Sequence, residues 1–434
     1  MKKSILSCLG SGYSEAIRDV LWGHVYLTPG LAALIRSGPF MRLHRIMQLG
    51  PAFYVYPGAT HTRASHSIGV YHLAKRLLFC LAEQGADAWL SQEGVFSFLC
   101  AALLHDLGHF PYTHSLKELP LESHETLTAR IICSEPVKSL VKAAGGDPEF
   151  TAAIIDTEST LPGGQGELSF YRRLLSGTLD PDKLDYLNRD ARYCGVPYGA
   201  QDVDFILSCL HPHNERGADI GGRGIPSVES ILFSKYLMYR AVYWHRQVRS
   251  ATAMIKKAVL GVLEAGFISP DELYNLDDHL FFSLMESRKN VSSHALELLS
   301  LIQSVHDGRL YVPVAEFSFD IFPAKLWEIN KRSELEESLA FDLSPVLKKI
   351  RKEMLIIDVP EPISFESGLY VADEGCFFPE SSSTFKSEVV SALVKSLRII
   401  RVFVDARSFP RGGKTGSVDS RILQITQKWL QLLT

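Results

Sequence analysis

The amino-acid sequence predicts a mainly α-helical protein with a smaller α+β lobe towards its C-terminal end. Apolar residues recur at helical spacing until about residue 309, and from about residue 310 they alternate or cluster as they do in strands. The chain has 434 residues, too many for one compact core. We therefore expect a helical core with an N-terminal β arm at residues 1–215, a helical extension completing its pocket at 216–309, and the α+β lobe at 310–434.

Periodicity and turn residues place the elements of the first half of the chain. Residues 17–27 are rich in β-branched and aromatic types around Gly23, which predicts a short hairpin or extended arm. Pro29 is expected to open a helix, and Gly108 and Gly195 to close two others. The helices predicted here cover residues 31–49, 65–85, 96–107, 123–132 and 179–192.

The second half of the chain changes from helical to mixed patterning. Residues 211–226 are rich in Gly, Arg and His and predict a loop or a short pair of strands. One long helix is expected at 227–265, followed by helical structure at 271–305. In the lobe we expect strands within 312–321, at 355–359 and at 397–404, helices at 344–354 and 420–433, and a loop-rich stretch at 360–383.

Composition narrows the class of protein. The formal net charge is -4, so the whole chain has no electrostatic footprint for nucleic acid or an anionic membrane. Its seven cysteines are scattered and form no C-x-x-C pair, which indicates reduced thiols and a cytoplasmic location. No run approaches the roughly 18 apolar residues that a membrane-spanning helix needs.

The strongest local feature is the pair His105-Asp106 at the end of an apolar helix. Burying an imidazole beside a carboxylate is costly unless a cation or good hydrogen-bond partners satisfy them. A single histidine on an apolar helix is usually a satisfied core residue, but five further histidines lie close by in the sequence. Imidazole with carboxylate suits Mn, Fe, Zn, Ni or Co better than Ca. The surrounding histidines are His61, His66, His109, His114 and His124.

Four segments together resemble the HD superfamily of metal-dependent phosphohydrolases. They are residues 40–50 (FMRLHRIMQLG), 55–69 (VYPGATHTRASHSIG), 105–114 (HDLGHFPYTH) and 179–190 (LDPDKLDYLNRD). More narrowly, they are similar to the deoxynucleoside triphosphate triphosphohydrolase branch, which includes vertebrate enzymes that join a sterile-alpha-motif domain to an HD domain. The likeness covers residues 17–265, more than half of the chain. A His-Asp pair alone would be a weak signal, but the combination is specific.

The resemblance implies a role for each matching position. One divalent transition metal would be held by His66, His105, Asp106 and Asp182, and Mg would accompany the substrate triphosphate. The metal would polarise a phosphoryl oxygen and lower the pKa of a bound water. The implied catalytic residues are His109, His114 and His124, with either His114 or His124 as the general acid. The implied substrate contacts are Gln48, Leu49, Arg63, Lys183, Tyr186 and Asp190.

Three further groups of charged residues near these motifs carry separate expectations. Related enzymes often carry a carboxylate three residues after the histidine that matches His114, but this chain has Lys117 there. Glu118 follows at i+4, a spacing that on a helix would let it reach His114, and both outcomes stay open. Asp185 and Arg189 are expected to form an i,i+4 pair on the helix surface. The last group, Arg240, His245 and Arg246, either completes a phosphate pocket or lies exposed or at an interface.

The resemblance implies hydrolysis of a deoxynucleoside triphosphate to nucleoside and triphosphate. Two alternatives stay open: hydrolysis of another phosphate ester, such as a nucleoside monophosphate or a cyclic nucleotide, and a nucleotide-sensing scaffold with weak turnover. The intact ligand set argues against an inactive scaffold, because a buried charged cluster is costly to keep. The expected partners are a nucleotide substrate and other copies of the chain in a dimer or tetramer, with no membrane.

Overall fold

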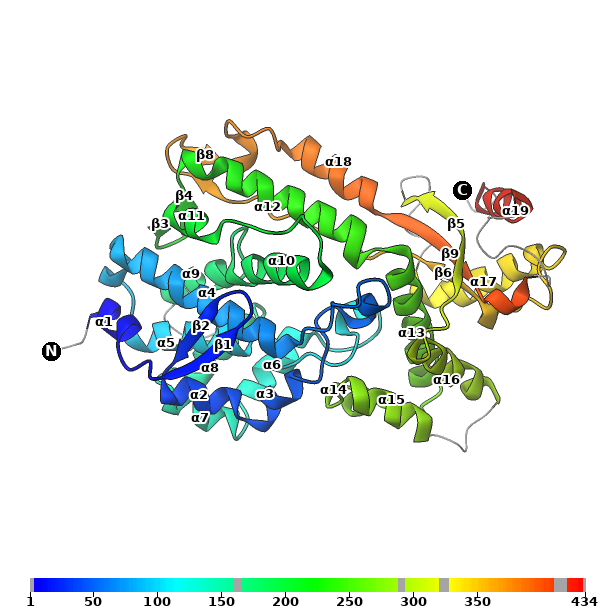
Figure 1. The fold of residues 1–434 in the computed structure, drawn as a ribbon, viewed down its shortest axis with the longest axis horizontal. Coiled ribbons are helices and arrows are strands. Elements are labelled where there is room, and N and C mark those ends of the chain that lie inside the picture. The colour runs from blue at the N-terminus through cyan, green and yellow to red at the C-terminus, as the bar shows by residue number, and fades with distance from the viewer. Residues whose placement is uncertain (1–3, 160–164, 288–292, 320–327, 410–419, 432–434) are drawn as a thin grey trace.

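A computed structural model describes residues 4–159, 165–287, 293–319, 328–409 and 420–431. The protein is mainly α-helical with small sheets, as the sequence predicts, and Figure 1 shows the helical core separated from a smaller mixed lobe. The core elements are α1 (Ile5–Gly10), β1 (Glu15–Asp19), β2 (Gly23–Leu27), α2 (Pro29–Ile35), α3 (Gly38–Leu43), α4 (Arg63–Glu83), α5 (Gln92–Leu104), α6 (His124–Ile132), α7 (Val137–Ala143), α8 (Pro148–Ile155), α9 (Gln165–Leu175), α10 (Pro181–Cys194) and α11 (Val203–Ser208).

After α11 the chain continues through further helices into the mixed lobe (Figure 1). The remaining elements, in chain order, are β3 (Leu210–His213), β4 (Gly217–Ile220), α12 (Ile225–Met238), α13 (Arg246–Glu264), α14 (Pro270–Tyr274), α15 (Asp278–Ser287), α16 (Ser293–His306), β5 (Val312–Ser318), α17 (Ile329–Leu343), β6 (Leu355–Asp358), β7 (Tyr370–Val371), β8 (Cys376–Phe377), α18 (Ser387–Leu397), β9 (Ile399–Val404) and α19 (Ser420–Gln431). No helix among the described residues is long and apolar enough to cross a membrane.

Three helices of the core, α4, α5 and α10, pack together and carry the candidate site. Thr62 caps α4 and Ser91 caps α5 by accepting from backbone N–H groups of the first turn. Asp180 caps α10 in the same way, Pro181 opens the helix, and Gly195 ends it in the left-handed conformation. These caps fix where each helix begins, and so they fix which residues stand in the first turn.

The N-terminal arm is the hairpin that the sequence predicts. Strands β1 and β2 pair in antiparallel register, with Glu15 opposite Leu27 and Asp19 opposite Gly23. Asp19 accepts from the backbone N–H groups of Leu21 and Trp22, which closes the turn. The hairpin lies against α4, where the Tyr71 hydroxyl donates to the backbone carbonyl of Tyr26.

Two long helices predicted from periodicity are broken in the structure. The prediction for residues 31–49 is wrong, because α2 stops at Ile35 and α3 ends at Leu43; Pro39 cannot donate the N–H that a continuous helix needs. The prediction for residues 227–265 is wrong as well. A π-turn over Tyr239–Tyr243 and an extended residue, His245, separate α12 from α13.

The mixed lobe contains a three-stranded antiparallel sheet in the order β5-β9-β6. Helices α17 and α19 pack beside it around a core of their own. The predicted helix at 344–354 is wrong, since α17 ends at Leu343 and Lys349 has a φ of 52°. The segment after β6 returns to the helical core, where β7 pairs with β4 and α18 packs along α12 (Figure 1).

Candidate active site

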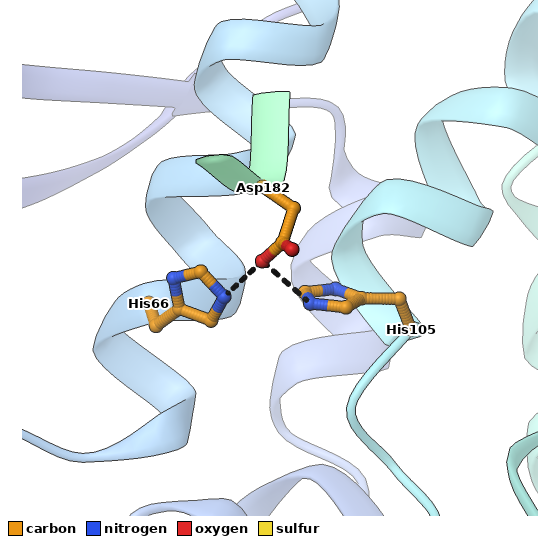
Figure 2. Close-up of side chains that lie close together, drawn as sticks. All are labelled: His66, His105 and Asp182. Carbon is orange, nitrogen blue, oxygen red and sulfur yellow. Dashed lines mark hydrogen bonds and ion pairs between the residues drawn. The ribbon is translucent and has the colours of Figure 1, made fainter. Parts of the chain in front are cut away.

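Three helices bring the four predicted metal ligands to one place. His66 lies in the first turn of α4, Asp182 lies in the first turn of α10, and His105 and Asp106 directly follow α5. The Nε2 atom of His66 is 2.8 Å from Asp182 Oδ1. The Nε2 atom of His105 is 3.3 Å from Asp106 Oδ1 and 3.7 Å from Asp182 Oδ1. Figure 2 shows both imidazole rings pointing at the Asp182 carboxylate.

The hydrogen bonds of the two rings assign their tautomers. The Nδ1 atom of His66 lies 2.8 Å from a carboxylate oxygen of Asp185, and that of His105 lies 3.0 Å from the carbonyl of Ala102. When the rings are neutral, as metal ligation requires, both Nδ1 atoms donate to these acceptors, so both Nε2 atoms offer lone pairs towards Asp182. His105 Nε2 is buried and has no hydrogen-bond partner. Four acceptors therefore face one another, and a cation is what such an arrangement needs.

A divalent transition metal fits this donor set. An ion with bonds of about 2.0–2.2 Å to imidazole and carboxylate places neighbouring ligand atoms about 3.0–3.5 Å apart. The distances of 2.8, 3.3 and 3.7 Å between the candidate ligands bracket that range. Mixed nitrogen and oxygen ligands favour Mn, Fe, Zn, Ni or Co. The metal's identity does not follow from the donor set.

In the metal-free site, electrostatics favour a protonated His66 and an ionised Asp106. Burial would lower the pKa of His66, but hydrogen bonds to Asp182 and Asp185 outweigh it and raise that pKa to about 10. Burial would raise the pKa of Asp106, but His105 and Arg63 hold it far below its usual value. A proton therefore occupies the His66–Asp182 contact at neutral pH when no metal is bound, which makes the proton a competitor of the metal.

Asp185 is a supporting residue of this site, and the predicted surface pair with Arg189 is wrong in its placement. Both side chains are fully buried, and Arg189 donates to Asp185 through Nε (2.7 Å) and Nη2 (2.9 Å). Asp185 also accepts from Trp22 Nε1 at 2.6 Å. A Cβ at Gly69 would lie 1.9 Å from Asp185 Oδ1, so this contact needs glycine. The sequence signal that could have revealed this role of Asp185 is its spacing, because Asp182 and Asp185 stand at i,i+3 on one helix face.

A cavity of about 380 Å³ opens beside the ligands, within the size range of small-molecule sites. Both oxygens of Asp190 are engaged, one by His61 Nε2 at 2.8 Å and one by the Tyr243 hydroxyl at 2.6 Å. Sequence reasoning missed Tyr239, Tyr243 and Trp244, which also line the cavity. The predicted substrate and catalytic residues that line it are Gln48, Leu49, Arg63, His109, His114, His124, Tyr186 and Asp190.

Three histidines form a cluster on one wall of the cavity. His109 is buried, its Nε2 lies 3.2 Å from His114 Nε2, and its ring centroid is 3.9 Å from that of His124. His124 Nδ1 lies 3.1 Å from Glu125, whereas His114 is exposed to the cavity. Loss of water contacts and the Arg63 cation hold the pKa of His109 and His114 below the usual value; burial lowers that of His124 to about 4. These shifts favour the neutral form of all three histidines.

Lys183, which the sequence predicts to contact substrate, does not line the cavity. Its ammonium donates to Asp180 Oδ2 at 2.7 Å and to the Gly177 carbonyl at 3.0 Å. Arg240, His245 and Arg246, the residues in and just after the π-turn, do not line the cavity either. Arg240 donates to the Tyr236 hydroxyl, His245 caps α13, and Arg246 is exposed.

Glu118 does not reach His114; it pairs with two cations from other elements. Both of its carboxylate oxygens accept from Arg332 of α17, at 2.9 and 3.0 Å, and one also accepts from Lys256 of α13 at 2.6 Å. Lys117 instead lines the cavity. The loop that carries His114 is therefore tied to the C-terminal lobe through Glu118.

Comparisons with known proteins identify two family matches along the chain. Residues 63–157 match the HD domain, and residues 208–402 match an HD associated region. An uncharacterized protein of Methanocaldococcus jannaschii is 30% identical over 369 residues, which covers 83% of this chain and 73% of that protein. An uncharacterized protein of Bacillus subtilis is 37% identical over 226 residues, or 52% of this chain and 50% of that protein.

A vertebrate relative and two solved structures extend the likeness over most of the chain. The deoxynucleoside triphosphate triphosphohydrolase SAMHD1 of Bos taurus is 25% identical over 385 residues, covering 81% of this chain and 62% of that protein. A hypothetical protein from Aquifex aeolicus has a TM-score of 0.67 at 26% identity, covering 90% and 96% of the two chains. A phosphohydrolase from Bacteroides thetaiotaomicron has a TM-score of 0.68 at 22% identity, covering 90% and 99%. This chain thus spans only half to two thirds of its Bacillus and bovine relatives.

Proposed function

The chain belongs to the family of HD-domain metal-dependent phosphohydrolases, and from that premise we propose that it hydrolyses a deoxynucleoside triphosphate to nucleoside and inorganic triphosphate. The observation that carries the proposal is the convergence of His66, His105 and Asp182, with Asp106 3.3 Å from His105, beside a cavity lined by histidines and tyrosines. The likeness to the bovine triphosphohydrolase supports the choice of substrate. Hydrolysis of a phosphate ester is the general activity; the triphosphate is the proposed specific substrate.

We assign the metal to His66, His105, Asp106 and Asp182, with Asp185 and Ala102 holding the two rings. When bound, the metal supplies Lewis acidity and a water of lowered pKa. Arg63 lies against Asp106 at 3.0 Å and orients that carboxylate. Mg entering with the triphosphate would neutralise the remaining phosphate charge.

We assign general-acid catalysis to His114. Among the three clustered histidines its ring is the most exposed to the cavity, so it can approach the leaving oxygen of the substrate. Its pKa is low in the free protein, and an anionic phosphate beside it would raise that pKa and favour the imidazolium. His109 lies between His114 and Asp106 and steadies the ring, and His124, paired with Glu125, faces the same space.

The opposite wall of the cavity suits a nucleoside. The Tyr186 ring lies edge-on to Tyr243, with centroids 6.5 Å apart, and Tyr243 in turn donates to Asp190. The side-chain oxygen of Gln48 is buried without a partner, which leaves an acceptor for a sugar hydroxyl. Leu49 and Trp244 add apolar surface for a base.

The test is product identification with metal-loaded protein and a panel of deoxynucleoside triphosphates, ribonucleoside triphosphates, monophosphates and cyclic nucleotides. We expect nucleoside and inorganic triphosphate from the deoxynucleoside triphosphates, and His114→Asn should lose most of kcat while KM changes little. Orthophosphate as the sole inorganic product would overturn the proposal. Turnover restricted to monophosphates or cyclic nucleotides would instead support the alternative phosphate ester.

Assembly and location belong to the same proposal. The family likeness supports a dimer or tetramer, and the composition supports a cytoplasmic protein. Light scattering after size-exclusion chromatography would measure the mass of the assembly. A mass equal to one chain of 48.4 kDa would contradict the proposed oligomer.

A further inference from the structure

The charges that line the cavity do not by themselves favour a polyphosphate. Among the described residues, the lining contains three cations, Arg63, Lys117 and Arg249, and a larger set of carboxylates. When the histidine ligands are neutral, as metal binding requires, the charges of the lining side chains sum to one net negative charge. A substrate with several phosphates needs the divalent metal and at least one cation that is not already neutralised. The carboxylates of the lining are Asp106, Asp182, Asp190 and Glu361.

Two of the three cations are already paired with protein carboxylates. Arg63 Nη1 lies 3.0 Å from Asp106. Arg249 donates to both oxygens of Asp358, at 2.6 and 2.8 Å, and to Glu361 at 2.9 Å. Lys117 makes no ion pair within the part of the chain that the structure describes, and its side chain is exposed. Lys117 is thus the cation that the cavity can offer to a ligand.

The local backbone directs Lys117 towards the same space as His114. Residues Thr113–Leu116 form a 3₁₀ turn, and Lys117 continues it with a φ of -56° and a ψ of -23°. In a 3₁₀ turn the side chains at i and i+3 lie one above the other, so His114 and Lys117 share a face. Arg332 and Lys256 hold Glu118 on the other side, away from the cavity. That clamp prevents the turn from rotating Lys117 away.

We propose that Lys117 binds the outer phosphates of a polyphosphate substrate and makes the cavity prefer linked phosphates to a single one. The proposal rests on the proposed function, since it names the part of the substrate that this cation selects. Its physical basis is the free ammonium beside His114, in a cavity whose other cations are neutralised, together with the engagement of Lys183 by Asp180. A lysine serves here as a point charge for phosphate oxygens.

The experiment compares the binding of inorganic tripolyphosphate and orthophosphate to metal-loaded protein by calorimetry, with excess Mg so that the ligand does not strip the bound metal. Lys117→Met should weaken tripolyphosphate binding about tenfold, the effect of one charge-assisted contact. Orthophosphate binding, which depends mainly on the metal, should change by less than about threefold. Lys117→Arg should restore most of the lost affinity because it restores the charge.

Lys142→Met is the matched control, because Lys142 is an exposed lysine on α7 that does not line the cavity. It should leave both affinities unchanged, and thermal melting should show that all variants fold. Equal tripolyphosphate affinity in wild type and Lys117→Met, or a wild type that prefers orthophosphate, would overturn the proposal. If the wild type released no triphosphate from nucleotides, the proposed function would fail, while the binding ratio would still decide the role of Lys117.

Discussion

Two ends of the cavity are held by different parts of the molecule. The metal end is formed by His66, His105, Asp106 and Asp182, and the phosphate end, where we propose that phosphate binds, is formed by His114, Lys117 and Arg249. At the metal end, both histidine rings are fixed from within the helical core, His66 by Asp185 and His105 by the Ala102 carbonyl. At the phosphate end, the charges are fixed from the C-terminal lobe, where Asp358 holds Arg249 and Arg332 holds Glu118. The positions of the metal-ligating histidines therefore depend on the helical core. The positions of the charged side chains that would face the substrate depend on contacts with the C-terminal lobe.

The largest expected effect comes from removing a ligand at the metal end. Asp106→Asn keeps the size of the side chain but removes the negative charge that faces His105 and Arg63. We expect metal content to fall from about one ion per chain to near zero. Activity should fall by more than the roughly 10- to 100-fold that loss of an outer partner causes. Metal analysis by mass spectrometry measures the content directly.

The control for that experiment is Asp204→Asn, an exposed carboxylate that pairs with Arg76 on the surface. It should retain metal and activity. Full metal content in Asp106→Asn would show that the ligand assignment is wrong. Loss of metal in both variants would point to a general defect rather than to the site.

The metal end also predicts a pH dependence whose sign follows from His66. Burial opposes protonation, but Asp182 and Asp185 raise the pKa of His66 to about 10 in the metal-free protein, so the ring is an imidazolium at neutral pH. A metal ligand must be a neutral imidazole, so binding releases this proton. Apparent metal affinity should therefore rise with pH, by up to about tenfold per unit between pH 6 and 8, and level off above the raised pKa.

Calorimetric titration of the metal at pH 6, 7 and 8 in buffers of different ionisation enthalpy measures both the affinity and the number of protons released. One proton per metal would match displacement from His66. An affinity that stays constant with pH would contradict the assignment of the proton to the ligand site.

Residues placed by local sequence could be predicted from the sequence, whereas residues placed by contacts with distant segments could not. His66, His105-Asp106 and Asp182 stand in short motifs whose spacing is set by helix starts and ends, so residue order alone points to them. The engagement of Lys183 depends on the fold of the turn at Gly177, and that of Glu118 depends on Arg332, which is over 200 residues away. Local spacing suggested His114 as the partner of Glu118, but in the folded protein Glu118 pairs with Arg332 and Lys256.

The fold shows the same limit. Apolar periodicity identified α4, α5, α6 and α10 and the strands near residues 312–318, 355–358 and 399–404, because burial of one face leaves a repeating pattern. It did not detect the break between α12 and α13, because the π-turn over Tyr239–Tyr243 keeps nearly the same apolar content as a helix. The break matters, since it brings Tyr239, Tyr243 and Trp244 to the cavity.

A smaller effect is expected from the partner of His66. Asp185→Asn still offers an acceptor to His66 Nδ1 but removes the charge that makes the ring a stronger ligand, so metal affinity should fall about 10- to 100-fold. Among the described residues, the buried Arg189 would keep only Asp19 as an anionic partner, which should lower stability by about 3–5 kcal/mol. Metal titration and chemical denaturation separate the two effects.

Trp22→Phe is the matched control for Asp185→Asn, because it removes one hydrogen bond to Asp185 and leaves the charge in place. Its effect on metal affinity should be less than about threefold. If both variants bound metal as the wild type does, Asp185 would have a structural role only. If Trp22→Phe lost as much affinity as Asp185→Asn, packing rather than charge would control His66.

The smallest effect is expected at the link between the lobe and the loop that carries His114. Glu118→Gln removes the charge that binds Arg332 and Lys256, and the Glu118 side chain is 23% exposed, so we expect a loss of about 1–3 kcal/mol in unfolding free energy. Because the 3₁₀ turn would then be free to rotate, KM for a triphosphate should rise a few-fold, while metal content stays unchanged. Differential scanning calorimetry, steady-state kinetics and metal analysis measure the three quantities.

Glu122→Gln is the nearby control, since Glu122 pairs with Arg130 where both side chains are exposed. Such a surface pair contributes less than about 1 kcal/mol. An equal, small effect in both variants would show that the lobe does not set the position of the turn. Loss of metal in Glu118→Gln would show that the two ends of the cavity are coupled, because the core alone would then not hold the ligands. A rise in KM with metal retained is the result that separates the phosphate end from the metal end.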